Sequence, residues 1–309
     1  MSINVEKPER VRPLARTHSS EDGDDNDSGG GRPGPRDAVR KVAFVLYPDF
    51  TALDLVGPYE IISRWPEVDV RFVARSFDPV KTDRGLTVLP TDTTKTLLDP
   101  DLIVIPGSGN PLPLLEDHVL REWLRATGPR CRWTASVCTG AGLYAAAGLL
   151  DGKKTSTHWG FRDNLRALGI DVVDERVVSQ GTHISAAGVS AGIDMALSLT
   201  EQVHGRTMAE ALQLVIEYDP QPAFDSGSLT KASAATQRLA KRILLGDHPL
   251  RMASSMSRQI LGARLRRARR PLSAKAADAR NALGMVICCF SPNVPGLWGR
   301  RFWVLAAAK

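Results

Sequence analysis

The cysteine at position 138 stands where a buried strand would meet the start of a helix. The run ASVCTGAG at residues 135–142 follows apolar sequence and continues into small, glycine-rich sequence. This pattern is typical of a nucleophile elbow, a tight strand-to-helix turn that needs small residues around the nucleophile. Ser136 and Gly140 meet that need. A thiol beside the positive end of a helix is expected to ionise readily, so the pattern predicts a nucleophilic thiolate at Cys138.

The alternative for Cys138 is a structural role, because free cysteine is among the most buried residue types. The small residues on both sides favour the nucleophile. The four cysteines of the chain are Cys131, Cys138, Cys288 and Cys289. They lack the spacing of a secreted disulfide framework, and reduced thiols are therefore expected.

Asp54 follows the first apolar run and is the candidate acid and base. A carboxyl group that faces Cys138 in a desolvated crevice would have a raised pKa, which suits proton transfer near neutral pH. The alternative is that Asp54 only caps a helix start. Glu60 is a second candidate, but its place inside the helix favours a surface role.

The turn PGSG at residues 106–109 could direct backbone N–H groups at a substrate. We expect Gly107 and Ser108 to bind substrate, and their amides together with that of Thr139 to form donors for developing negative charge. The alternative is a plain glycine-rich turn. The hydroxyl of Thr139 is a candidate catalytic group, with a simple helix-start residue as the alternative.

His158 lies in the sequence THW at residues 157–159 and is a candidate substrate-binding residue. It has two further interpretations, a base for Cys138 or a packed histidine beside Trp159, and the packed histidine is favoured. The sequence contains no metal-ligand spacing and no dinucleotide-binding fingerprint, so neither a metal nor a cofactor is expected. Asp194 is interpreted as a structural helix residue.

Apolar strands alternate with helical patterns through the middle of the chain, which predicts an α/β fold with a parallel central sheet and helices on both faces. Main strands are expected at 42–47, 70–74, 101–105 and 132–137, and helices at about 54–64, 116–126, 139–147, 159–168, 190–204 and 206–217. Short strands near 171–173, 177–180 and 183–187 resemble a late hairpin-like insertion. The turns at 49–54, 107–109 and 138–140 follow strand ends, so they are expected to converge on one crevice.

Charge divides the chain of 309 residues into three parts. Residues 1–40 carry a net charge of −1, residues 41–230 of −7 and residues 231–309 of +14. The first part is rich in Ser, Gly, Pro and Asp and is expected to be disordered. The second is the folded domain, and its acidic balance argues against a nucleic-acid-binding core. The third is expected to be a basic extension, partly helical or disordered, in which the run RLRRARR at 264–270 could touch nucleic acid.

No apolar run approaches the length of a membrane span and no charged-then-apolar leader begins the chain, so a cytoplasmic location without membrane contact is expected.

Taken together, the motifs resemble the ThiJ/PfpI superfamily within the class I glutamine-amidotransferase-like fold, and in particular its isonitrile hydratase branch. The motifs that carry the resemblance, in family order, are LDLVGPYE at 53–60, PG at 106–107, SVCTGA at 136–141, LLDGK at 149–153, THW at 157–159, AGVSAGID at 187–194 and EYDPQP at 217–222. The resemblance covers about residues 41–230. It implies a flavodoxin-like three-layer sandwich, a homodimer and a small-molecule substrate.

The resemblance also implies a reaction, in which water adds to an isonitrile to give an N-substituted formamide. The residues that carry this reaction in the family map to Cys138, Thr139 and Asp54. Protease-type and glyoxalase-type relatives have histidine directly after the cysteine, whereas this chain has Thr139, which argues against those activities. Two alternatives remain, a non-catalytic ligand-sensing domain like that of AraC-type transcription regulators, and another cysteine hydrolase of the superfamily.

Overall fold

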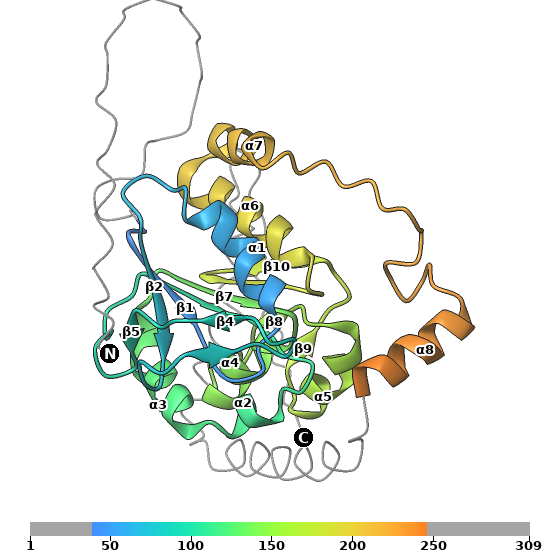
Figure 1. Cartoon of the computed structure of the whole chain (residues 1–309), viewed down its shortest axis with the longest axis horizontal. Helices are drawn as coiled ribbons and strands as arrows, with labels where there is room; N and C mark the ends of the chain where they lie inside the picture. Colours follow the sequence, from blue (N-terminus) through green and yellow to red (C-terminus); the bar gives the residue numbers. More distant parts are fainter. Residues whose placement is uncertain (1–38, 246–309) are drawn as a thin grey trace, which may run out of the picture. The chain divides into compact units, whose positions relative to one another are not determined.

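A seven-stranded sheet forms the centre of the protein in a computed structural model, which describes residues 39–245 (Figure 1). The strand order is β10-β11-β7-β6-β1-β2-β5. The strands are β1 (Lys41–Val45), β2 (Asp69–Ala74), β5 (Asp92–Thr93), β6 (Leu102–Ile105), β7 (Trp133–Val137), β10 (Val177–Gln180) and β11 (His183–Ala186). All neighbouring pairs are parallel except β10 and β11, which are antiparallel. This arrangement confirms the predicted α/β fold with a mostly parallel central sheet.

The middle strands are apolar because both faces of the sheet are covered. Every residue of β6 is buried, as are four of the five residues in each of β1 and β7. Figure 1 shows α1 (Ala52–Ile62), α6 (Ala191–His204) and α7 (Arg206–Val215) on one side of the sheet. It shows α2 (Leu112–Glu116), α3 (His118–Thr127) and α4 (Ala141–Ala147) on the other side. Helices α5 (Arg162–Ala167) and α8 (Ala234–Leu245) follow β8 and α7 in the chain.

Two small sheets complete the described region. Strands β3 (Val80–Lys81) and β4 (Thr87–Val88) form one, and β8 (Lys154–Thr155) and β9 (Asp171–Val172) form the other. The four long strands and the main helices lie where the sequence predicted them, within a few residues. The helix expected at 139–147 begins as a 3-10 turn at Cys138–Gly140, and the helix expected at 159–168 begins as a 3-10 turn at Trp159–Phe161.

The prediction of a late hairpin-like insertion near 171–187 is partly wrong. Strands β10 and β11 do form a hairpin, but β11 pairs with β7 inside the central sheet. The hairpin therefore extends the core sheet, and only β9 belongs to a separate small sheet. The prediction failed because these strands are short and do not continue the strand-helix alternation of the first half of the domain.

The predicted disordered segment 1–40, apart from its last two residues, and the basic run 264–270 lie outside the described residues. The expected C-terminal extension contributes one described helix, α8, which belongs to the same compact unit as the central sheet.

Candidate active site

Cys138 occupies a left-handed turn between β7 and α4. Its φ angle is 58°, a conformation that costs a non-glycine residue free energy and commonly marks a functional site. The turn is possible because its neighbours are small. A Cβ atom on Gly140 would collide with the carbonyl oxygen of Ile105. The nucleophile elbow predicted from the sequence is therefore present as a backbone structure.

Asp54 faces this elbow from the first turn of α1 and does not cap that helix. Thr51 is the N-cap residue, and the Oδ2 atom of Asp54 accepts a hydrogen bond from the backbone N of Gly107 at 2.8 Å. A Cβ atom on Gly107 would lie 2.8 Å from both Oδ2 of Asp54 and Cβ of Cys138. The carboxyl group and the cysteine therefore flank the same glycine, at the carboxyl edge of β1, β6 and β7.

Asp54 is fully buried, with an exposed fraction of 0%, and this burial is the main influence on the pKa of its carboxyl group. Desolvation raises its pKa from 3.8 to about 7, against the opposing effects of the Gly107 N–H and the Cys138 thiol. The Oδ1 atom has no hydrogen-bond partner among the described residues. A carboxyl group in this state can release and accept a proton near neutral pH.

The prediction of an ionised thiol is wrong for the free protein. Cys138 is 5% exposed, and burial followed by the negative charge of Asp54 raises the pKa of its thiol well above the ordinary value. The backbone N–H of Thr139 lowers this pKa, as a helix start should, but its effect is smaller. The resting pair is therefore a neutral thiol beside a carboxyl group that titrates near neutrality.

Thr139 ties the turn after β6 to the elbow. Its Oγ1 accepts from the backbone N of Ser108 at 2.8 Å and donates to the backbone O of Ser108 at 2.9 Å. The Ser108 hydroxyl is engaged with the backbone of Asn110 at 3.1 Å. The amides of Gly107 and Ser108 are thus both bound within the protein. The donor group predicted from these two amides is not formed, because Asp54 and Thr139 take them.

His158 lies on the other side of Cys138. Its backbone N donates to the carbonyl O of Cys138 at 3.4 Å, and its Nδ1 accepts from the backbone N of Gly160 at 3.2 Å. An accepting Nδ1 places the proton of the neutral ring on Nε2. Burial lowers the pKa of His158, which favours this neutral form. The charge that most affects the thiol is that of Asp54.

A cavity of about 690 Å³ opens over the sulfur. Four predicted residues line it, namely Ser108, Cys138, Thr139 and His158, while Asp54 and Gly107 are buried beside it. Parts of all three predicted turns border this cavity, so the expected crevice is present.

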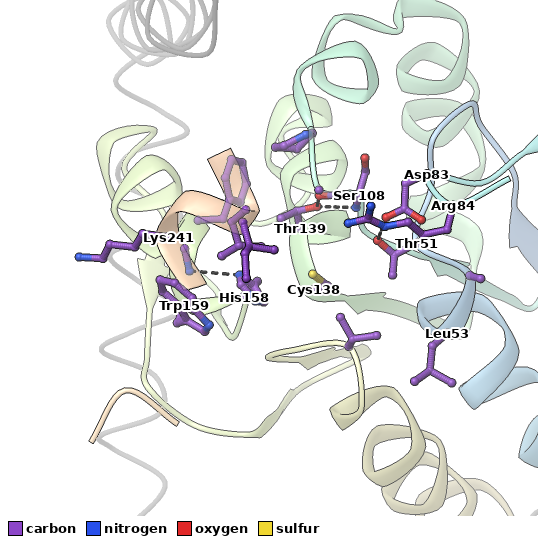
Figure 2. A pocket seen from close by; sticks show the side chains of 18 of the residues that line it. Thr51, Leu53, Asp83, Arg84, Ser108, Cys138, Thr139, His158, Trp159 and Lys241 are labelled. Carbon is purple, nitrogen blue, oxygen red and sulfur yellow. Dashed lines mark hydrogen bonds between the residues drawn. The ribbon is translucent and has the colours of Figure 1, made fainter. Parts of the chain in front are cut away.

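Several wall residues of the cavity were not predicted from the sequence. Asp83 and Arg84 come from the β3–β4 hairpin, and Figure 2 shows them on the opposite side of Cys138 from Trp159 and Lys241. Asp83 accepts a hydrogen bond from the Thr51 hydroxyl at 3.1 Å and adds to the raised pKa values of the active pair. No sequence motif marks these residues, because only the placement of the β3–β4 hairpin in the folded chain brings them to the cavity.

Two other candidates have structural partners. Glu60 forms an exposed ion pair with Arg64, with 2.8 Å between the charged atoms. Asp194 pairs with Arg176 at 2.6 Å and accepts a hydrogen bond from the Tyr218 hydroxyl at 3.1 Å. Neither carboxyl group lines the cavity over Cys138, in agreement with the surface and structural roles favoured from the sequence.

Comparison with known proteins assigns the chain to a family. Residues 40–202 match the DJ-1/PfpI family. The chain belongs to this family. The isonitrile hydratase of Pseudomonas putida is 39% identical over 202 residues, which cover 65% of this chain and 89% of that protein. The resemblance that the motifs carried is thus confirmed at the level of the family.

The chain is also similar to two further proteins. The crystal structure of a THiJ/PfpI family protein from Pseudomonas syringae has a TM-score of 0.66 and 32% identity, and the match covers 76% of this chain and 96% of that one. The HTH-type transcriptional regulator CdhR of Pseudomonas aeruginosa is 29% identical over 175 residues, and the chain spans about half of its length. Within residues 39–245, no helix has the length and apolar character needed to cross a bilayer.

Proposed function

We propose that this member of the DJ-1/PfpI family is an isonitrile hydratase, which adds water to an isonitrile and releases an N-substituted formamide. The observation that carries the proposal is the pairing of Cys138 on its elbow with the buried Asp54, whose pKa is about 7. The 39% identity to the isonitrile hydratase of Pseudomonas putida supports the choice of substrate class.

In the first step the Sγ atom of Cys138 forms a bond to the terminal carbon of the isonitrile. The thiol proton passes to the Asp54 carboxylate and from there to the same carbon, so the carbon–nitrogen triple bond becomes a double bond. The product of this step is a thioimidate attached to the enzyme. The Thr139 N–H, which favours negative charge on the sulfur, stabilises the thiolate as the proton leaves.

In the second step water adds to the thioimidate carbon. Asp54, again a carboxylate, takes one proton from the water and passes it to the nitrogen, which gives a tetrahedral intermediate that carries a hydroxyl group. The carbon–sulfur bond then breaks and its electron pair returns to the sulfur, while Asp54 takes the hydroxyl proton and passes it to the sulfur, so the formamide carbonyl forms and the Cys138 thiol is restored. One carboxyl group acts as acid and base in turn, a task suited to a pKa near the working pH.

Thr139 and the turn after β6 position this pair. The double hydrogen bond between the Thr139 hydroxyl and Ser108 holds the turn, and Gly107 in the same turn donates to Asp54. We therefore assign Thr139 and Gly107 a positioning role. Ser108 and His158 line the cavity and are proposed substrate contacts.

The test is incubation of the purified protein with cyclohexyl isocyanide while N-cyclohexylformamide is followed by chromatography. Formation of the formamide by the wild type and its loss in Cys138→Ala support the proposal. Absence of formamide with a panel of isonitriles, or full turnover by Cys138→Ala, contradicts it.

A second candidate function is ligand sensing without turnover. It is supported by the similarity to the regulator CdhR over 175 residues. This function predicts binding of a small molecule that is not converted, together with DNA retention in a gel shift that is lost when residues 231–309 are deleted. Turnover of an isonitrile with no DNA retention would reject it.

A further inference from the structure

Part of the wall of the active-site cavity comes from a segment beyond the residues that match the family. The family match ends at residue 202, yet Leu229, Lys241, Ile243 and Leu244 line the cavity that holds Cys138. The last three of these residues lie in the final turns of α8. The sequence predicted for this part of the chain a basic extension, partly helical or disordered.

The position of α8 follows from local hydrogen bonds and one apolar contact. The side chain of Gln237 donates to the backbone O of Leu229 at 2.8 Å, which ties the helix to the segment before it. At the other end, Cδ1 of Leu244 lies 3.4 Å from where a Cβ of Gly160 would be, and Nδ1 of His158 lies 3.3 Å from the same point. Leu244 therefore packs over the turn that carries His158.

The surface that α8 presents to the cavity is aliphatic. Ile243 is 64% exposed and Leu244 is 36% exposed, so both side chains present uncovered apolar surface. Figure 2 shows the amino group of Lys241 pointing away from Cys138. Trp159, on the same side of Cys138 as Lys241, adds an aromatic ring to this wall. An apolar ligand group would gain free energy by covering this surface.

The size of the cavity gives the second part of the argument. About 690 Å³ lies within the range of roughly 300–1,000 Å³ found for sites that bury a drug-sized molecule. The isonitrile group itself needs only the space beside Cys138. The rest of the cavity has room for a large substituent, and its surface at α8 matches an apolar one.

We infer that α8, through Ile243 and Leu244, is the outer wall of the substrate site and selects isonitriles with a long apolar substituent on nitrogen. The identity of the reacting group rests on the proposed function, whereas the apolar wall rests only on the cavity. Short isonitriles react at Cys138 without reaching α8. Longer ones gain binding at this wall for each methylene group that they bury.

The experiment measures kcat/KM for n-alkyl isonitriles from ethyl to hexyl with the full-length wild type and the double variant Ile243→Ala, Leu244→Ala. Alanine preserves the helix, and both replaced side chains are partly exposed, so the fold is retained. Leu239→Ala is the matched control, because Leu239 is 51% exposed on the same helix but does not line the cavity.

In the wild type and the control, kcat/KM is expected to rise with chain length by up to about fourfold for each buried methylene group. In the double variant the hexyl-to-ethyl ratio of kcat/KM should fall by about tenfold. An equal ratio in the wild type and the double variant, or an equal fall in the control, overturns the inference.

A second measurement separates this inference from the proposed function. The rate at which N-alkylmaleimides of increasing length modify the Cys138 peptide, followed by mass spectrometry, needs no hydratase activity. If no isonitrile is converted, the proposed function fails, and a length dependence of labelling that the double variant loses still supports the wall. Labelling rates with the same length dependence in both proteins overturn it.

Discussion

Asp54→Asn is the perturbation that most sharply separates the proton chemistry of the site from its structure. The asparagine side chain keeps an oxygen that can accept the hydrogen bond now donated by Gly107 N at 2.8 Å. The cavity and the elbow should therefore persist. The variant cannot take the proton of Cys138, and because general acid–base catalysis typically contributes 10²–10⁴-fold, kcat/KM should fall by about that factor.

The pH dependence of activity follows from the state of the pair. Reaction requires one proton shared between Cys138 and Asp54, so protonation of both groups at low pH blocks it. With a pKa of about 7 for Asp54 and a still higher pKa for the thiol, kcat/KM of the wild type should rise through an inflection near pH 7. Asp54→Asn should lose this inflection.

Stability gives an independent measure of the same group. The folded-state pKa of Asp54 is raised, so the unfolded chain releases this proton near pH 3.8 and the folded protein only near 7. The wild type therefore loses stability as the pH rises through this window. A displacement from 3.8 to about 7 corresponds to about 4 kcal/mol. The free energy of unfolding of Asp54→Asn, relative to the wild type, should increase by about this amount between pH 3 and pH 8.

The assays are formamide production from pH 5.5 to 9 and urea unfolding across the stability window, with Glu60→Gln as the control. Glu60 is a carboxyl group on the same helix whose partner is the exposed Arg64. The control should keep both the activity and the inflection. A flat wild-type profile, or an Asp54→Asn variant whose relative stability does not change with pH, would refute the assignment of the raised pKa to Asp54.

Three further outcomes test how the elbow is held. Gly107→Ala places a Cβ atom 2.5 Å from Thr139 N, so it should lower the free energy of unfolding in urea by about 1–3 kcal/mol and abolish turnover. Gly109→Ala is the control, because its Cβ atom would meet no atom within 4 Å, and it should change neither stability nor turnover. Thr139→Val removes both hydrogen bonds to the Ser108 backbone, so it should lower the free energy of unfolding by about 1–3 kcal/mol and also lower kcat. Thr139→Ser keeps the hydroxyl and should retain most of the stability and most of kcat. Equal behaviour of the two variants would contradict the positioning role. Cys138→Gly should be more stable than Cys138→Ala by about 1 kcal/mol, since only glycine adopts a φ of 58° without cost; the reverse order would contradict a strained elbow.

The sequence predicted those parts of the site that depend on neighbouring residues. The elbow could be read from small residues beside Cys138, because a left-handed turn excludes large ones. The convergence of three turns followed from parallel strands, whose carboxyl ends share one edge of the sheet. Elements of two residues, such as β3 and β4, carry no periodicity that a sequence could display.

The predictions that were wrong depend on distances between residues that are far apart in the chain, which the sequence does not show. The helix start beside Cys138 suggested a thiolate, but burial and the charge of Asp54 outweigh the single Thr139 N–H. The amides of Gly107 and Ser108 looked free because their partners lie 53 and 31 residues away in the chain. The wall formed by α8 was missed for the same reason.

The covalent intermediate is the most direct test of the account, because a bond between Cys138 and the isonitrile carbon is its central claim. Wild-type protein mixed with an isonitrile, quenched during the first turnover and digested, should carry on the Cys138 peptide a mass increase equal to one intact isonitrile. That adduct should form no more slowly than turnover, and Cys138→Ala should give neither adduct nor formamide. Formamide production at the full rate without any adduct on Cys138 would contradict the account.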